Sequence, residues 1–377
     1  MTLRHALLGS GFALSLALIS PAVLAQAPPA APAAPLSLER PPATPKPAAP
    51  KPATPSAPRA PSAKVPLPKP SPARATAPAE APQTAAAPAA AKPGQEPDLA
   101  FGAFQRGYYL TAFHEATKRI DAKGDPKAMT LLGELYANGL GVGADDTKAA
   151  EWYSLAAARG DAQAMFSLAM FRMGARGGPR DREEAARLLA QASKLGHPAA
   201  TYDLGLLYLE GQQFPQDLSR AAELFRKAAD AGVPEAQYAL ATLYKDGRGV
   251  QKDPKEAVRL MGLAARADLT DAQVEYAIAL FNGAGIAKNE AQAAKLLQEA
   301  SMRGSAIAQN RLARLLAAGR GVPADPVAAV KWHLIAKAAG AGDPYLDNFM
   351  ANQTPEVRAS GERLAKPWLD MIRLSRS

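Results

Sequence analysis

A period of 36 residues constrains this chain more than any other feature of its sequence. Closely similar units begin without insertion at Ala128, Ala164, Ala200, Ala236, Ala272 and Ala308. A period in this range is typical of a helical solenoid, because each short unit can bury its apolar face only against the next one. We therefore expect an all-α fold in which helix pairs stack along the chain.

The first helix of each unit is predicted to run about 12 residues from the starting alanine. A leucine column and a small residue directly after it, such as Leu132 and Gly133, give the spacing of a buried face that a neighbouring helix can approach closely. A glycine near the end of the helix is expected to adopt the left-handed conformation. These glycines are Gly139, Gly211, Gly247, Gly283 and Gly319.

The second helix is predicted to begin after a capping residue that accepts its free N–H bonds. The capping positions are Asp145, Asp181, Asp217, Asp253, Asn289 and Asp325. Glu184, Glu256 and Gln292 add the spacing of a capping box. Trp152 and Trp332 occupy a column that is otherwise leucine, so we interpret them as core residues.

The unit reads A-x-x-x-L-[GA]-x-x-[YL]-x-x-G-x-G-V-x-x-D, followed by A-x-x-[WL]-x-x-x-A-A-x-x-G. It resembles the Sel1-like repeat family, a relative of tetratricopeptide repeats with a longer turn between the helices. The resemblance covers residues 128–344 as six repeats, with departures at Ala175–Pro179, Gln212–Gln213 and Asp268. It implies a right-handed solenoid and a non-enzymatic scaffold or adaptor, since some envelope members regulate sensor kinases or assist assembly.

By resemblance to tetratricopeptide repeats, first-helix positions outside the leucine core line a concave groove. One column places Phe166, Tyr202 and Tyr238 in consecutive repeats and continues with Val274 and Asn310. Such a groove would bind an extended peptide or a partner helix, with aromatic area for affinity and charges for register. In an alternative that stays open, the aromatic rings only fill contacts between repeats. The predicted groove residues are Phe166, Met170, Tyr202, Asp203, Leu206, Tyr238, Lys245, Glu275, Phe281, Arg311 and Arg314.

Two segments precede the repeats. Residues 1–25 combine a basic start, an apolar run shorter than the ~20 residues of a membrane span, and small residues at Val23 and Ala25, as in a cleaved signal peptide. An uncleaved anchor is the alternative. In residues 26–97, 22 of 72 residues are proline, which predicts a disordered Pro/Ala-rich linker. We therefore expect a periplasmic or secreted protein.

The net charge of +9 does not indicate nucleic-acid binding. Residues 26–97 carry eight Lys/Arg and three Glu, or +5, and Arg4 adds one, so the rest of the chain holds only +3. A domain with so small a surplus lacks the electrostatic footprint of a nucleic-acid binder. The linker lysines would permit weak contact with a cell wall or membrane surface, although their simpler role is to keep the segment soluble.

No motif predicts a catalytic residue, a cofactor or a metal. The chain has no cysteine, and His5, His114, His197 and His333 lack partners at ligand spacing. The Gly-x-Gly turns follow helices and are not joined to Gly-Lys-Ser/Thr, so they do not predict a phosphate site. The competing hypothesis is an envelope hydrolase or cell-wall-binding enzyme whose site is assembled across repeats.

Both ends of the repeat array differ from its interior. Residues 98–127 are interpreted as a divergent helix pair, and residues 345–377 as capping helices with a kink expected at Pro367. A solenoid needs atypical terminal units to cover its last apolar faces.

Overall fold

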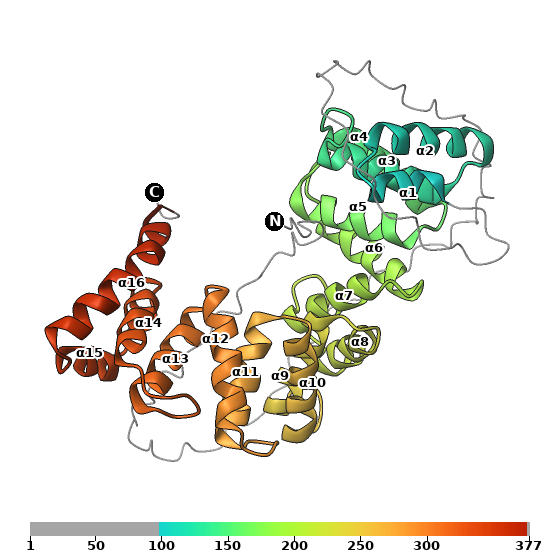
Figure 1. Cartoon of the computed structure of the whole chain (residues 1–377). Coiled ribbons are helices and arrows are strands. Elements are labelled where there is room, and N and C mark those ends of the chain that lie inside the picture. The colour runs from blue at the N-terminus through green and yellow to red at the C-terminus, as the bar shows by residue number, and fades with distance from the viewer. Residues whose placement is uncertain (1–97, 375–377) are drawn as a thin grey trace, which may run out of the picture. The chain divides into compact units, whose positions relative to one another are not determined.

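The computed structural model describes residues 98–374, and the signal-peptide and linker predictions lie outside them. The described residues form sixteen α-helices and no strand, which confirms the predicted all-α class (Figure 1). The helices are α1 (Leu99–Gln105), α2 (Tyr109–Lys123), α3 (Pro126–Asn138), α4 (Asp146–Ala158), α5 (Ala162–Gly174), α6 (Arg182–Lys194), α7 (Pro198–Glu210), α8 (Leu218–Asp230), α9 (Pro234–Asp246), α10 (Pro254–Arg266), α11 (Thr270–Asn282), α12 (Glu290–Met302), α13 (Ala306–Ala318), α14 (Pro326–Ala338), α15 (Pro344–Ala351) and α16 (Pro355–Leu374).

The odd-numbered helices from α3 to α13 are the first helices of the repeats. Each begins two residues before the starting alanine, earlier than predicted. In α3, α5, α7, α9 and α13 the preceding turn supplies a capping side chain or the helix starts with a proline, whereas α11 begins at Thr270 with neither. For example, the Asp161 carboxylate accepts the Ala164 N–H at 2.7 Å at the start of α5. This N-cap lies at the end of the previous unit, outside the pattern from which the start was predicted.

The turn between the two helices of a repeat has one geometry throughout. Five first helices end at the predicted glycines in the left-handed conformation, and Ala175 takes the same conformation in the second repeat with φ 56°. All six predicted capping residues accept a backbone N–H of the second helix. The turn therefore persists where glycine is absent.

The capping-box interpretation was wrong for Glu184 and Glu256. The N–H of the N-cap, which a capping box would occupy, donates to a carbonyl of the first helix, as in Asp181 N to Arg172 O at 3.1 Å. Glu184 pairs with the Arg172 side chain and Glu256 with Arg259. With the N-cap N–H already bonded, these carboxylates bind arginines.

The core is built from alanines, leucines and a few large rings. Trp152 and Trp332 are each 5 % exposed, which confirms them as core residues. The small residue of the first helix is matched to a ring of the second, since a Cβ at Gly205 would lie 2.6 Å from the Phe225 ring. Small residues thus allow the two helices of a repeat to approach closely.

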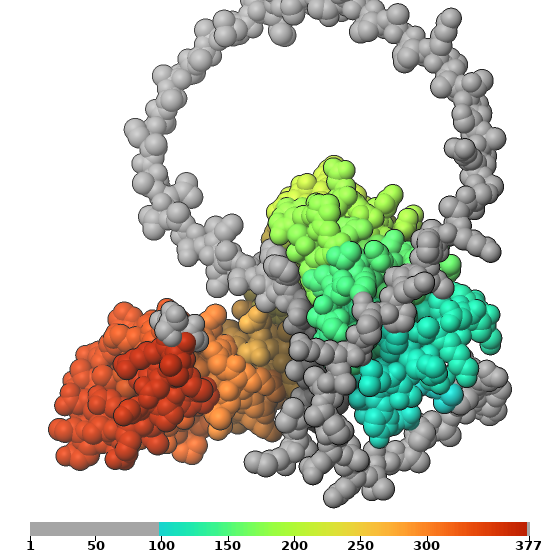
Figure 2. Space-filling view, turned by 90° about the horizontal axis from the view of Figure 1, so that it is seen from above, coloured from blue at the N-terminus to red at the C-terminus, as the bar shows by residue number. Residues whose placement is uncertain are grey.

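Consecutive repeats pack through the second glycine of the turn. A Cβ at Gly285 would lie 2.5 Å from the Pro254 carbonyl oxygen, at the start of the preceding repeat's second helix. Gly177, Gly249 and Gly321 meet the same helix position. Each helix packs against the next along the array, and successive colours lie in contact in Figure 2.

The C-terminal helices cover the last repeat. α16 packs on α14, where Trp368 meets Trp332 edge-on with ring centroids 5.5 Å apart. Pro367 lies within α16. Among residues 98–374, none of the helices combines the length and the hydropathy that a bilayer span requires.

Candidate partner-binding surface

Tyr202 on α7 and Tyr238 on α9 occupy equivalent positions of consecutive first helices. Both side chains are half-buried, and the Tyr202 ring packs 5.6 Å from the Phe225 ring. Burial and then nearby carboxylates raise the pKa of each tyrosine to about 12, so both hydroxyls stay protonated at neutral pH. Neither hydroxyl has a hydrogen-bond partner within residues 98–374, which leaves both available as donors.

Asp203 lies beside Tyr202 and has no cation to balance it. Burial, followed by the charge of Glu235, raises the pKa of Asp203 to about 7. Within the described range its carboxyl group forms no hydrogen bond or ion pair. Together with the Glu235 side chain in the first turn of α9, it gives this part of the surface an acidic character.

Phe166 on α5 contacts the N-cap residue of the next first helix, α7. Its ring stacks on the His197 ring with centroids 4.7 Å apart and planes 21° apart. His197 in turn caps α7 by accepting the Ala200 N–H, and burial lowers its pKa. One face of the Phe166 ring is therefore covered, as in the alternative that such rings fill inter-repeat contacts. Met170, about one turn further along the same helix, packs half-buried against the core.

In the middle repeats, two predicted groove residues pair with each other. Lys245 Nζ lies 3.1 Å from Glu275 Oε2, which links α9 to α11. Leu206 is half-buried against the core of α7 to α10. Val274, in the column of Tyr202 and Tyr238, is buried and cannot line a groove, because that position of α11 faces the core.

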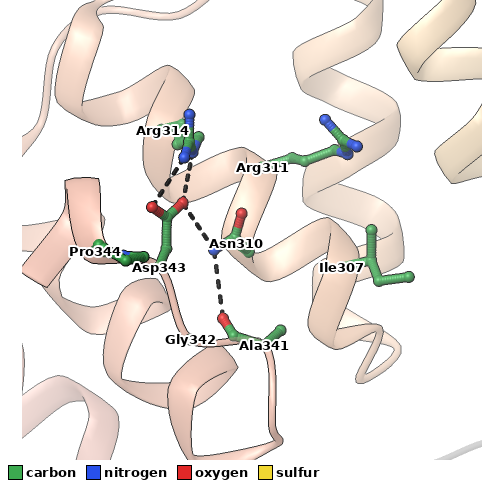
Figure 3. Close-up of a pocket in the computed structure, with 8 residues that line it drawn as sticks. All are labelled: Ile307, Asn310, Arg311, Arg314, Ala341, Gly342, Asp343 and Pro344. Atoms are coloured by element: carbon green, nitrogen blue, oxygen red, sulfur yellow. Dashed lines mark hydrogen bonds and ion pairs between the residues drawn. The ribbon is translucent and has the colours of Figure 1, made fainter. Parts of the chain in front are cut away.

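Phe281, Arg311 and Arg314 lie together at the C-terminal end of the repeats. They line a cavity of about 300 Å³, and the two arginines also border a second cavity of about 500 Å³. In the second cavity Arg314 donates to both carboxylate oxygens of Asp343, at 2.5 and 2.8 Å (Figure 3). These hydrogen bonds, led by that from Arg314, lower the pKa of Asp343 to about 2.

Sequence reasoning missed the acidic and aromatic partners of this region. Arg320 pairs with Glu290 at 2.5 Å and lies 4.2 Å from the centre of the Phe281 ring, and Arg314 lies over Tyr345. Arg176 pairs with Asp146 at the equivalent positions of two earlier repeats. The signal would have been an arginine directly after the left-handed residue that ends the first helix, with an acidic residue 30 positions before that arginine.

One further polar cluster joins α14 to α15. His333 is buried and its Nε2 lies 2.8 Å from Asp347 Oδ1, which also accepts from Lys337. No group of three histidine or acidic side chains in residues 98–374 is arranged to hold a metal ion.

The fold and these contacts define a helical-repeat protein built from two-helix units. The Sel1 repeat family model matches residues 126–161, 162–197, 198–233, 234–269, 270–305 and 306–340, more than half of the chain. The chain therefore belongs to the Sel1 repeat family, as its repeat pattern indicated. Repeats of this kind generally mediate protein–protein interaction and are typically non-enzymatic.

Two solved structures support the same assignment. A Sel1 repeat protein from Oxalobacter formigenes is 27% identical, with a TM-score of 0.55, and the match covers 64% of this chain and 97% of that one. A protective antigen with an SLR fold, present in uropathogenic Escherichia coli strains, is 25% identical with a TM-score of 0.51. That match covers 70% of this chain and 64% of the antigen. Among curated proteins, none matches the chain.

Proposed function

We propose that this protein is an exported, non-enzymatic adaptor that binds a protein partner along the exposed surface of its first helices. The observation that carries the proposal is that Tyr202 and Tyr238 have half-buried rings and hydroxyl groups that are unpaired within residues 98–374. Two half-buried rings on consecutive first helices keep hydroxyl donors without internal partners. Rigid aromatic side chains with a free polar group are the anchors that protein interfaces favour.

The location is proposed from the sequence of the N-terminal segments. A signal peptide over residues 1–25 would direct the chain to the periplasm or outside the cell, and residues 26–97 would act as a tether. An adaptor in the envelope, regulating signalling or assembly, fits both features. Such a tether would let the repeats bind a partner at a distance from whatever the N-terminal segment contacts.

The non-enzymatic role is proposed because Sel1 repeats are typically non-enzymatic scaffolds. Hydrolysis would require a nucleophile held beside a base. In the described part of the chain, no hydrogen bond joins a serine or threonine hydroxyl to the ring of a histidine, since the Thr201 hydroxyl donates to the His197 backbone carbonyl and not to its imidazole. Within the same part, Asp203 has no hydrogen-bonded partner to activate. Among residues 98–374, no specific contact favours the alternative of an envelope hydrolase.

The test is capture of partner proteins by the full chain and by a Tyr202→Ala, Tyr238→Ala double variant. We expect weaker capture by the double variant at unchanged helicity, because both anchors are lost. Tyr108→Ala is the matched control, since Tyr108 is 50% exposed and lies outside the proposed surface. Equal capture by the double variant and the parent would remove these tyrosines from the site.

A further inference from the structure

The two cavities at the C-terminal end of the repeats share a wall made by Arg311 and Arg314. We call them the arginine cavities. The 300 Å³ cavity has an apolar floor that includes Ile278, Leu315 and the Phe281 ring, with Tyr345 at its edge. Its volume is at the lower end of the range for ligand pockets, so it suits one or two side chains better than a whole cofactor.

Two of the three arginines that line these cavities are already neutralised. Arg314 binds Asp343, a carboxylate that is only 5 % exposed, and Arg320 binds Glu290. Both guanidinium groups also lie over aromatic rings, at 5.1 Å from Tyr345 and 4.2 Å from Phe281. Each is thus held on two sides, which fixes the walls of the cavities.

Arg311 is different, because it has no such partner. Its side chain is exposed and points away from Asp343, which is turned toward Arg314 and Asn310 (Figure 3). Within residues 98–374 it forms no hydrogen bond or ion pair. A free guanidinium group therefore stands between an apolar cavity and a polar one.

We propose that the arginine cavities bind a peptide segment of the partner that places an apolar side chain on the Phe281 floor and a carboxylate on Arg311. Arg311 can donate two parallel N–H bonds to a carboxylate, the geometry that makes such pairs selective. The apolar side chain leaves water for the cavity between α11 and α13. The pair of groups, rather than either alone, sets the specificity.

This inference rests on the proposed function and assigns one part of the binding surface. Tyr202 and Tyr238 lie on α7 and α9, whereas the arginine cavities lie on α11, α13 and the start of α15. Substitutions at the two places therefore report separately. If the tyrosine double variant binds the partner more weakly and Arg311→Gln binds it as the parent does, the adaptor role stands and the assignment of Arg311 is refuted.

The test is a selection of random short peptides displayed on phage against the immobilised full chain and its Arg311→Gln variant. We expect peptides enriched in Asp or Glu near Leu, Ile, Phe, Tyr or Trp, and loss of that enrichment on the variant. Neutral or basic peptides, the same peptides on both proteins, or no enrichment at all would each overturn the proposal.

Affinities then measure the carboxylate contact directly. An enriched peptide is labelled and titrated by fluorescence anisotropy, beside its counterpart with Asn or Gln in place of the acid. We expect binding to weaken about tenfold or more for Arg311→Gln or for the amide peptide, the loss typical of a charge-assisted hydrogen bond. The control Arg187→Gln changes an exposed arginine on α6 and should bind as the parent does. Equal weakening by Arg187→Gln would show only a general charge effect.

Discussion

Asp203 should make the stability of the repeats depend on pH. Burial and the charge of Glu235 raise its pKa from the ordinary 3.8 to about 7 in the folded protein. Between these two values the folded state holds a proton that the unfolded chain has released. The free energy of unfolding therefore falls as the pH rises through this window, and the full penalty applies above about pH 7.

The size of the penalty follows from the width of that window. Each pH unit is worth about 1.4 kcal/mol, and the window from 3.8 to about 7 spans roughly three units, so the upper value is ~4 kcal/mol. Asp203→Asn removes the charge and keeps the shape. Because the side chain retains some contact with water, we expect a gain of ~1–3 kcal/mol at about pH 8 and a smaller gain at about pH 5.

The assay is urea unfolding of the full chain, followed by circular dichroism at both pH values. Asp246→Asn is the matched control, since Asp246 is exposed at the end of α9. The quantity of interest is the increase in the free energy of unfolding caused by Asp203→Asn at pH 8, minus the increase it causes at pH 5. A variant that is less stable than the parent at pH 8, or a gain independent of pH, would refute the reasoning.

Three further substitutions test the turn and the core. Gly247→Val should destabilise the protein by more than ~1 kcal/mol, because a β-branched residue does not adopt φ 71° easily; an unchanged melting curve would contradict the turn assignment. Ala175→Gly should stabilise by up to ~1 kcal/mol, since glycine accepts φ 56° without strain, and a loss of stability in urea unfolding would count against it. Gly205→Ala should cost ~1–3 kcal/mol by crowding the Phe225 ring, and a silent substitution in the same assay would show that the ring yields freely.

The repeat geometry was predictable because its signals are local. Asp145 precedes the second helix by one residue, so its capping role can be read from the sequence alone. The capping box at Glu184 failed for the opposite reason, since the competing carbonyl belongs to Arg172 in the first helix. Asp268 shows that the left-handed backbone conformation of this turn is kept without glycine. It adopts φ 67° where other repeats have glycine, and its side chain pairs with Arg303.

The candidate surface was less predictable because its environment depends on how repeats stack. Lys245 and Glu275 were both placed in the groove, but their ion pair depends on the spacing of α9 and α11. The charge of Glu235 near Asp203 comes from the next first helix, and the ring that covers Phe166 belongs to His197, the N-cap of the next first helix. The sequence predicts which position of the repeat a residue occupies, whereas the packing of the repeats determines whether its side chain is free to contact a partner.

The most direct test of the adaptor account is site-specific photo-crosslinking in cells. A photoreactive residue is placed in the full chain at Tyr202, Tyr238 or Arg311 on first helices, and at the exposed Glu223 or Lys295 on second helices. The account predicts crosslinks to the same partner protein from the first-helix positions and none from Glu223 or Lys295. Crosslinks that arise only from the second-helix positions would contradict it.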